Sequence, residues 1–335
     1  MADNTILGPW IKRFLLEYLL SERNLARNTQ RSYRDTIRLL VQFLASAQKK
    51  EIDALKITDL SADHLRGFLK HIEQTRNCAI ATRNQRLAAI HALARFIGQW
   101  NPEYLAWCSE IRTVCFKKAQ HVPVTYLEKD EMEALLNAPD RSTALGRRDH
   151  ALLLFLYNSG ARAEEAASVN VRDLTLQTRK SGQSFVRIQG KGNKIRLCPL
   201  WSSTAAELEV LVHDRSSSER VFVNRLGQQL TRFGVHEIVT RHARSLKVRF
   251  PELQRKRPTP HTIRHTCATH LLRAGVDINT IRAWLGHVSL NTTNVYAEVD
   301  LKMKAEALAK CTVSPPKRRI AWSDRPGLLD FLQSL

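Results

Sequence analysis

The chain has 335 residues, of which 43% are hydrophobic, and it carries a formal net charge of +20 at pH 7. This length suits two domains better than one, and the apolar content excludes wholesale disorder. So large a positive excess favours binding to polyanions, with nucleic acid as the first expectation and an anionic membrane surface as the competing one. No apolar run approaches the ~20 residues of a membrane-spanning helix, so we expect no membrane partner.

The first part of the chain is predicted to be an all-helical bundle. Apolar residues recur at helical spacing over residues 6–20, in a helix that Asn28 and Thr29 can cap, in one that follows Ser61, and in one from about Ala81. The exposed faces of these helices are expected to contact DNA phosphates, although ordinary solvated surface is an equal alternative for any one side chain. The arginines concerned are Arg27, Arg31, Arg34, Arg76, Arg83 and Arg86.

The stretch from Phe116 to Val124 is polar and basic, contains a proline and has no apolar stripe, so it is predicted to be a linker. Helices are expected over residues 128–136 and 148–157. Near Ser184 the period changes from helical to alternating. Two short strands there flank a Gly/Asn turn at residues 189–193, which predicts a β-hairpin, and helices resume from about Ser203. The fold class expected is mainly α with a small antiparallel β-sheet.

A metal site is not expected. The six cysteines are scattered without a CxxC pair, which argues against a zinc ribbon or a disulfide framework and fits a reducing cytoplasm. His261 and His265 have the spacing of a zinc-binding helix, but Thr262 stands where a zinc protease needs a glutamate. We therefore predict neither a metal nor another cofactor.

A different chemistry fits the polar residues of the second half. Two arginines can hold the non-bridging oxygens of a phosphate in fork geometry, and two histidines can move protons near neutral pH. A tyrosine is a suitable nucleophile where the energy of a phosphodiester must be kept in a covalent intermediate. The residues are Arg162, His261, Arg264, His287 and Tyr296. This combination indicates DNA breaking and rejoining rather than hydrolysis.

Glycines are expected to present two of the cations. Gly160 follows a buried helix and allows a tight turn that would expose Arg162 from a rigid corner. Gly190 and Gly192 flank Lys191 at the hairpin tip, where its amine could act as the general acid toward a leaving 5′-oxygen. A lysine at a hairpin tip is more often simply solvated, so this residue taken alone is weak support.

At these residues the chain resembles the tyrosine recombinases of the phage integrase family, in a pattern most similar to Xer-like recombinases and transposon-encoded integrases. The resemblance rests on the segment from Arg148 through Ser159-Gly160-Ala161-Arg162, on Gly190-Lys191-Gly192-Asn193, on His261 with Arg264, on Leu285-Gly286-His287 and on Tyr296. It covers nearly the whole length. Ala163 and Ala166 depart from the larger apolar residues usual beside the first arginine, a packing change without an obvious chemical cost.

The resemblance implies a role for each residue. Arg162 and Arg264 would bind the scissile phosphate, Lys191 would protonate the leaving 5′-hydroxyl, and His261 would assist proton transfer at the tyrosine. His287 would hydrogen-bond the phosphate, Glu165 would support the site, and Tyr296 would form a 3′-phosphotyrosyl bond.

The resemblance also implies a domain plan. Residues 1–115 would form a helical, SAM-like core-binding domain, residues 116–125 a linker, and residues 126–313 an α+β catalytic domain. Residues 314–335 would be a C-terminal tail, and its residues 328–335 would dock on a neighbouring protomer unless the tail packs on its own domain. Residues 305–308, which precede the tail, could serve as the docking segment instead. The partners implied are double-stranded DNA with paired inverted half-sites and a homo- or hetero-tetramer of recombinase protomers, in the cytoplasm and associated with the nucleoid.

Two other functions stay open. The same fold could serve a catalytically silent DNA-binding accessory protein, although every expected active-site position is filled. It could also serve an enzyme like the type IB topoisomerases, which relaxes supercoils instead of exchanging strands. The separate helical N-terminal domain and the long tail favour recombination for integration, excision or transposition.

Overall fold

A computed structural model describes residues 4–118, 124–177, 182–190 and 193–286. The chain divides into two compact units, Met1–Val122 and Pro123–Leu335. This division falls inside the segment that the sequence indicates as a linker. Among the helices described, none combines the length and the apolar character needed to cross a bilayer.

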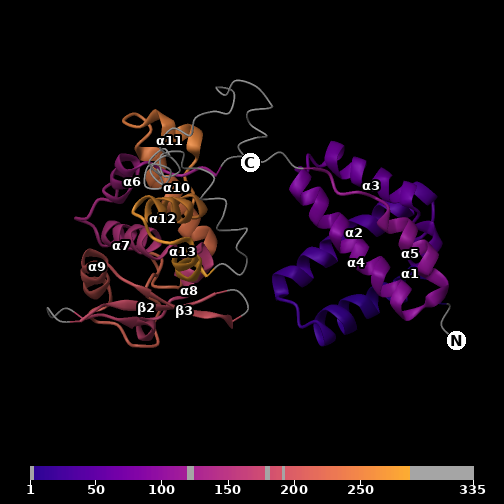
Figure 1. Cartoon of the computed structure of the whole chain (residues 1–335), viewed down its shortest axis with the longest axis horizontal. Coiled ribbons are helices and arrows are strands. Elements are labelled where there is room, and N and C mark those ends of the chain that lie inside the picture. Colours follow the sequence, from indigo (N-terminus) through magenta and orange to yellow (C-terminus); the bar gives the residue numbers. More distant parts are fainter. Residues whose placement is uncertain (1–3, 119–123, 178–181, 191–192, 287–335) are drawn as a thin grey trace, which may run out of the picture. The chain divides into compact units, whose positions relative to one another are not determined.

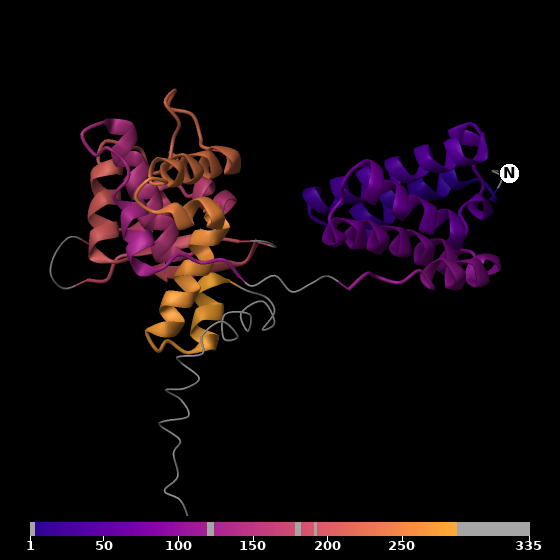
Figure 2. The same cartoon turned by 90° about the horizontal axis from the view of Figure 1, so that it is seen from above.

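The first unit is a bundle of helices around its own apolar core (Figures 1 and 2). Leu40, Leu65, Phe68, Leu87 and Phe96 are among the residues fully enclosed in that core. The bundle agrees with the pattern of apolar residues along the first part of the chain. Its helices are α1 (Leu7–Arg13), η1 (Phe14–Glu22), α2 (Arg27–Gln48), α3 (Ala62–Thr75), α4 (Ile80–Trp100) and α5 (Leu105–Arg112), with short 3₁₀ turns η2 (Ile52–Ala54), η3 (Ile57–Asp59) and η4 (Pro102–Tyr104).

Several details of this unit differ from the sequence-based expectation. Helix α2 begins at Arg27, its N-cap is Ala26 and no side chain caps it, so the prediction that Asn28 and Thr29 cap this helix is wrong. The helix predicted over residues 6–20 is α-helical only to Arg13 and continues as the π-helix η1 to Glu22. An apolar stripe indicates a helix but does not set its hydrogen-bond register, and here Phe14 packs against Tyr18 and Phe96 with ring centroids 5.7 and 5.5 Å apart. Helix α5 was not predicted, because its eight residues bury only Cys108 and Ile111 and show a short apolar stripe.

The second unit is mainly helical with one small sheet, which confirms the predicted fold class. In Figure 1 the sheet forms one edge of this unit. Helix α7 contacts α6, α8, α9 and α12 and so lies at the centre of the helices. The elements are α6 (Lys129–Leu136), α7 (Ala144–Ser159), α8 (Ala163–Ser168), η5 (Val171–Asp173), β1 (Leu174–Thr175), β2 (Phe185–Gln189), β3 (Ile195–Pro199), α9 (Ser202–Val212), α10 (Arg232–Ser245), α11 (Pro251–Lys256), α12 (Pro260–Arg273) and α13 (Ile278–Leu285).

The sheet has the antiparallel order β1-β2-β3. Strands β2 and β3 are the two arms of the predicted hairpin, and Ile188 pairs with Arg196 in their register. Strand β1 was not predicted, since its two residues are too few to show an alternating pattern. The inner face of β2 buries Val186 and Ile188 against the core of the unit.

Threonine side chains cap the N-termini of α7 and α12, two helices that position the candidate site. The Thr143 hydroxyl accepts from the Gly146 N–H at 3.0 Å at the start of α7. The Thr259 hydroxyl accepts from the Thr262 N–H at 3.2 Å at the start of α12, where Pro260 takes the first helical position. Each such hydroxyl supplies an acceptor to an N–H group that lacks a partner within its helix.

Candidate active site

Arg162 stands at the corner between α7 and α8. Helix α7 ends at Gly160, whose φ of +58° is left-handed. A Cβ atom there would clash with the Leu285 side chain, so both the backbone angle and the space require glycine. Arg162 then caps α8 with 34% of its side chain exposed. This is the rigid corner that the sequence predicts for Arg162.

Glu165 holds Arg162 in place from the first turn of α8. Its Oε2 accepts from the Arg162 backbone N–H at 3.0 Å, and its Oε1 accepts from the Arg162 guanidinium at 2.7 Å. Burial raises the pKa of this carboxyl, but hydrogen bonds and charge from Arg196 and Arg162 outweigh burial and bring the pKa to about 2. Glu165 is therefore ionised at neutral pH.

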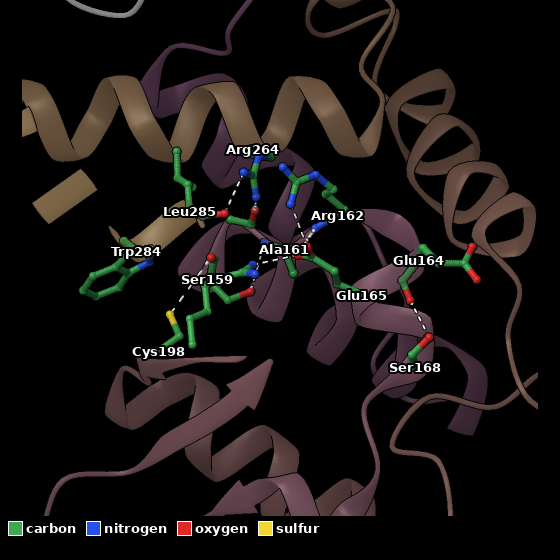
Figure 3. A network of polar contacts seen from close by, with 12 residues as sticks. Ser159, Ala161, Arg162, Glu164, Glu165, Ser168, Cys198, Arg264, Trp284 and Leu285 are labelled. Carbon is green, nitrogen blue, oxygen red and sulfur yellow. Dashed lines mark hydrogen bonds and ion pairs between the residues drawn. The ribbon is translucent and has the colours of Figure 1, made fainter. Parts of the chain in front are cut away.

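Arg264 on α12 joins two segments that are far apart in the chain. Its guanidinium donates to the Gly160 carbonyl at 2.5 Å and to the Leu285 carbonyl at 2.7 Å. Figure 3 shows this guanidinium between Leu285 and Arg162. Arg264 is only 2% exposed, so it is a buried charge with charge-assisted hydrogen bonds. The corner of α7 and α8 and the end of α13 are thereby fixed to α12.

Two histidines of α12 lie beside these arginines. The rings of His261 and His265 stack with centroids 6.2 Å apart. Burial, followed by the charges of Arg264 and Arg162, lowers the pKa of His261 below its ordinary value. Burial, with the charges of His261 and Arg264, lowers the pKa of His265 to about 4. Both imidazoles are therefore neutral at pH 7, and a neutral imidazole can accept a proton.

The structure adds Arg196, which the sequence reasoning missed. It donates from Nη2 to Glu165 Oε2 at 2.7 Å, and its side chain is 10% exposed. The sequence carries no signal for it, because the alternation of Ile195, Arg196 and Leu197 predicts that the arginine points outward. In the structure Ile195 and Leu197 are 59% and 61% exposed, and β3 turns the charged residue inward instead. A charged side chain on an inner face needs a partner.

Three of the predicted residues, Lys191, His287 and Tyr296, lie outside the described residues. The glycines that precede two of them are described. A Cβ atom on Gly190 would lie 3.2 Å from Glu165 Oε1, and one on Gly286 would lie 3.2 Å from Arg196 Nη1. The described part of the site thus brings together Arg162, Glu165, Arg196, His261 and Arg264. Within the ranges that the structure describes, no group of three His, Cys, Asp or Glu side chains could hold a metal ion.

The predicted phosphate-contacting arginines of the first unit differ in exposure. Arg27, Arg31 and Arg34 are exposed on α2, and Arg34 pairs with Asp35 at 2.8 Å. Arg38 is exposed as well and shares their helical spacing, a signal that the sequence reasoning overlooked.

Two arginines of α4 form hydrogen bonds within the protein. Arg86 is partly buried and donates to Cys78 Sγ at 3.1 Å. The prediction that Arg83 lies on an exposed face is wrong. Arg83 is 6% exposed and donates to the Cys115 carbonyl at 2.9 Å, because the chain after α5 returns across α4.

Comparison with known proteins matches both units. The profile described as "Phage integrase family" matches residues 125–303, and that of "Phage integrase, N-terminal SAM-like domain" matches residues 11–99. An integrase/recombinase of Sinorhizobium fredii, y4rC, is 35% identical over 338 residues, covering 100% of both chains. Tyrosine recombinase XerC of Pelotomaculum thermopropionicum is 30% identical over 300 residues, covering 86% of this chain and 93% of its own.

Solved structures share the fold. XerH site-specific recombinase bound to palindromic difH substrate matches with a TM-score of 0.64 and 23% identity over 86% of this chain and 81% of its own. The Tn1549 transposon integrase in complex with transposon right end DNA matches with a TM-score of 0.65 and 15% identity, covering 89% of this chain and 98% of its own.

Proposed function

This chain belongs to the phage integrase family and is a tyrosine recombinase, and from this premise we propose that it cuts and rejoins DNA strands at specific sites. Tyr296 attacks a phosphodiester, forms a 3′-phosphotyrosyl bond and releases a 5′-hydroxyl. A 5′-hydroxyl from the partner duplex then attacks that bond and releases the tyrosine. The ester energy is kept throughout, so the exchange needs no ATP.

The observation that carries this proposal is that Arg162, Arg264 and His261 lie close to one another although they come from distant parts of the chain. Arg264 bonds to the corner that presents Arg162, and both charges act on the same imidazole of His261. Fixed cations of this kind stabilise the extra negative charge of a pentavalent transition state. The fork of Arg162 binds one side of the phosphate, and Arg264 supports the other.

Proton transfer is assigned to two residues, His261 and Lys191, and a phosphate hydrogen bond to a third, His287. The lowered pKa of His261 supports a neutral imidazole that accepts the proton of Tyr296. Lys191 gives a proton to the leaving 5′-oxygen, and His287 donates a hydrogen bond to the phosphate. The positions of Gly190 beside Glu165 and of Gly286 beside Arg196 support these two roles, because Lys191 and His287 are the next residues in the chain.

DNA binding and assembly complete the proposal. Residues 1–115 contact DNA through α2, where Arg27, Arg31 and Arg34 are exposed. Two protomers on inverted half-sites pair with two others into a tetramer, and residues 314–335 connect neighbouring protomers. Such an enzyme acts in the cytoplasm, at the nucleoid.

The proposal is tested by trapping the covalent intermediate. The protein first selects its site from random duplexes, and a nicked duplex with that site is then incubated with it. We expect a 3′-linked adduct from the wild type and none from Tyr296→Phe. Arg162→Ala should lower the cleavage rate about 100-fold or more while binding stays measurable, because a transition-state ligand is lost.

The matched control is Tyr126→Phe, which removes a hydroxyl bonded to Arg273 at 2.8 Å and should leave the adduct unchanged. Absence of an adduct from the wild type would contradict the proposal. An adduct accompanied only by relaxation of supercoils, without recombinant product, would indicate that the enzyme is a topoisomerase and not a recombinase.

A further inference from the structure

Arg196 is a buried cation that the proposed reaction does not use. It lies on β3, and its Nη2 donates to Glu165 Oε2 at 2.7 Å, while the side chains of the two residues are 10% and 6% exposed. Within the described ranges, its Nε has no hydrogen-bond partner. A charge buried to this degree requires compensation, and Glu165 supplies it.

The charges around Glu165 explain why two arginines are present. One carboxylate lies between the guanidinium groups of Arg162 and Arg196, each 2.7 Å from one of its oxygens. Glu165 paired with Arg162 alone would form a neutral pair with little attraction for a phosphate. With Arg196 added, the three side chains carry one net positive charge. Arg162 is the more exposed arginine, at 34% against 10%, so the surplus charge faces the solvent there.

Arg196 also contacts two corners that precede proposed catalytic residues. A Cβ atom on Gly286 would lie 3.2 Å from Nη1 of Arg196 and 3.3 Å from its Cδ, so this arginine lies directly against the end of α13. A Cβ atom on Gly190 would lie 3.4 Å from the same Nη1. One side chain therefore binds Glu165 and lies beside Gly190, at the start of the hairpin turn, and beside Gly286, the residue before His287.

We propose that Arg196 is a positioning residue that neutralises Glu165, so that the charge of Arg162 remains available to the scissile phosphate. This inference rests on the proposed function, because it assumes that Arg162 binds that phosphate. Glu165 fixes the direction of Arg162 through two hydrogen bonds, and Arg196 offsets the negative charge that this orientation requires. Recognition of the phosphate then depends on a residue that does not touch it.

The test compares four variants with the wild type in single-turnover cleavage at saturating nicked duplex. Arg196→Met should slow cleavage about tenfold, less than the 10²–10³-fold loss typical of a direct transition-state donor. Arg196→Lys keeps the charge and should retain most of the rate. The double variant Arg196→Met with Glu165→Gln should regain most of the rate lost in Arg196→Met, because no carboxylate then competes for Arg162.

The fourth variant, Arg187→Met, is the matched control. Arg187 lies on the adjacent strand β2 and pairs with Asp173 at 2.8 Å, its side chain is 51% exposed, and among the described residues it forms no ion pair with Glu165. Like Arg196→Met, the Arg187→Met variant loses one arginine charge from this sheet, and it should cleave at the wild-type rate. DNA affinity and thermal stability are measured for every variant, so that loss of binding or of folded protein is separated from slower cleavage.

Cleavage by Arg196→Met at the rate of Arg187→Met would overturn the inference. So would a double variant that cleaves no faster than Arg196→Met although both are folded and bind DNA, because Arg196 would then be a purely structural ion-pair partner. These outcomes leave the proposed function intact. A wild type without an adduct, or Arg162→Ala with wild-type cleavage, would overturn the proposed function and this inference together.

Discussion

The guanidinium of Arg264 donates to two carbonyls that lie on separate segments, Gly160 and Leu285, at 2.5 and 2.7 Å. Replacing Arg264 by a residue without a donor would therefore leave these two buried carbonyl groups without this hydrogen-bond donor. It would also loosen the corner that carries Arg162. Arg162 itself is one-third exposed and has its own anchor in Glu165. At the residue scale, a change at Arg162 reports on phosphate binding more cleanly than a change at Arg264, which also holds the fold.

His265 makes folding dependent on pH. Burial, with the nearby charges of His261 and Arg264, lowers its pKa from 6.5 to about 4. Between these values the unfolded chain binds a proton at this histidine and the folded chain does not, so stability falls as pH drops from 6.5 toward 4. Above pH 6.5 His265 is neutral in both the folded and the unfolded chain, so it causes no loss of stability there. We expect His265→Gln to lose less stability than the wild type between pH 7 and pH 4.5, measured by urea unfolding.

His213→Gln serves as the control for this prediction, because the side chain of His213 is 80% exposed. Its loss of stability over the same pH interval should equal that of the wild type. If His265→Gln also followed the wild type, burial of a neutral imidazole at His265 would not be a source of the acid sensitivity.

At the scale of the elements, a buried carboxylate connects α7 with α10. Asp149 is 1% exposed and accepts from Arg148 at 2.7 Å, from His242 at 2.8 Å and from Arg241. Burial raises the pKa of this carboxyl, but the hydrogen bond of His242 and the charges of Arg148 and Arg241 lower it overall. The helix that ends at the Arg162 corner is thus fixed to α10 by charge as well as by apolar packing.

We expect Asp149→Ala to destabilise the protein by about 3–5 kcal/mol, because it leaves the buried charge of Arg148 without its partner. Chemical unfolding at pH 7 measures the effect. Asp214→Ala is the control, since its side chain is 95% exposed and lies 3.9 Å from His213; it should change stability by about 0.5 kcal/mol or less. Equal effects of the two substitutions would show that the charges around Asp149 contribute nothing to the packing of α7.

The elements also differ in how well the sequence predicted them. Helices α3 and α7 combine a capping residue at the first turn with a long apolar pattern. Helix α3 follows Ser61 as predicted, and α7 (Ala144–Ser159) extends the predicted range 148–157 by a few residues at each end. Strand β1 and helix α5 have two and eight residues, too few for a clear period. The π-helix η1 depends on ring packing against α4, which no local pattern contains.

For the whole molecule, the net charge of +20 favours nucleic-acid binding through the release of counterions. Arg27, Arg31 and Arg38 form an exposed row on α2. Each phosphate contact contributes about 0.9 to the slope of log affinity against log salt. The triple substitution of these arginines by alanine should therefore reduce the magnitude of that slope by about 3 when DNA affinity is titrated with salt.

The control for this prediction replaces three cations that already pair with carboxylates. Arg13 pairs with Glu17 at 3.2 Å, Lys50 with Asp59 at 2.7 Å and Arg66 with Asp63 at 2.7 Å. Removing these should change the slope much less than removing the α2 row. An equal change in both would mean that net charge alone, and not the position of the row, determines binding.

The sequence by itself indicated the family, because the segments around Arg162 and from His261 to Arg264 are each short motifs that can be recognised locally. It also determined most helices, since capping and apolar periodicity act over a few residues. Only the tertiary structure decided that Arg196 meets Glu165, which lies 31 residues away, and that Arg264 meets Gly160, which lies 104 residues away. It alone showed that Arg83 is buried. Contacts and burial of this kind arise when distant segments pack together, and no short stretch of sequence records them.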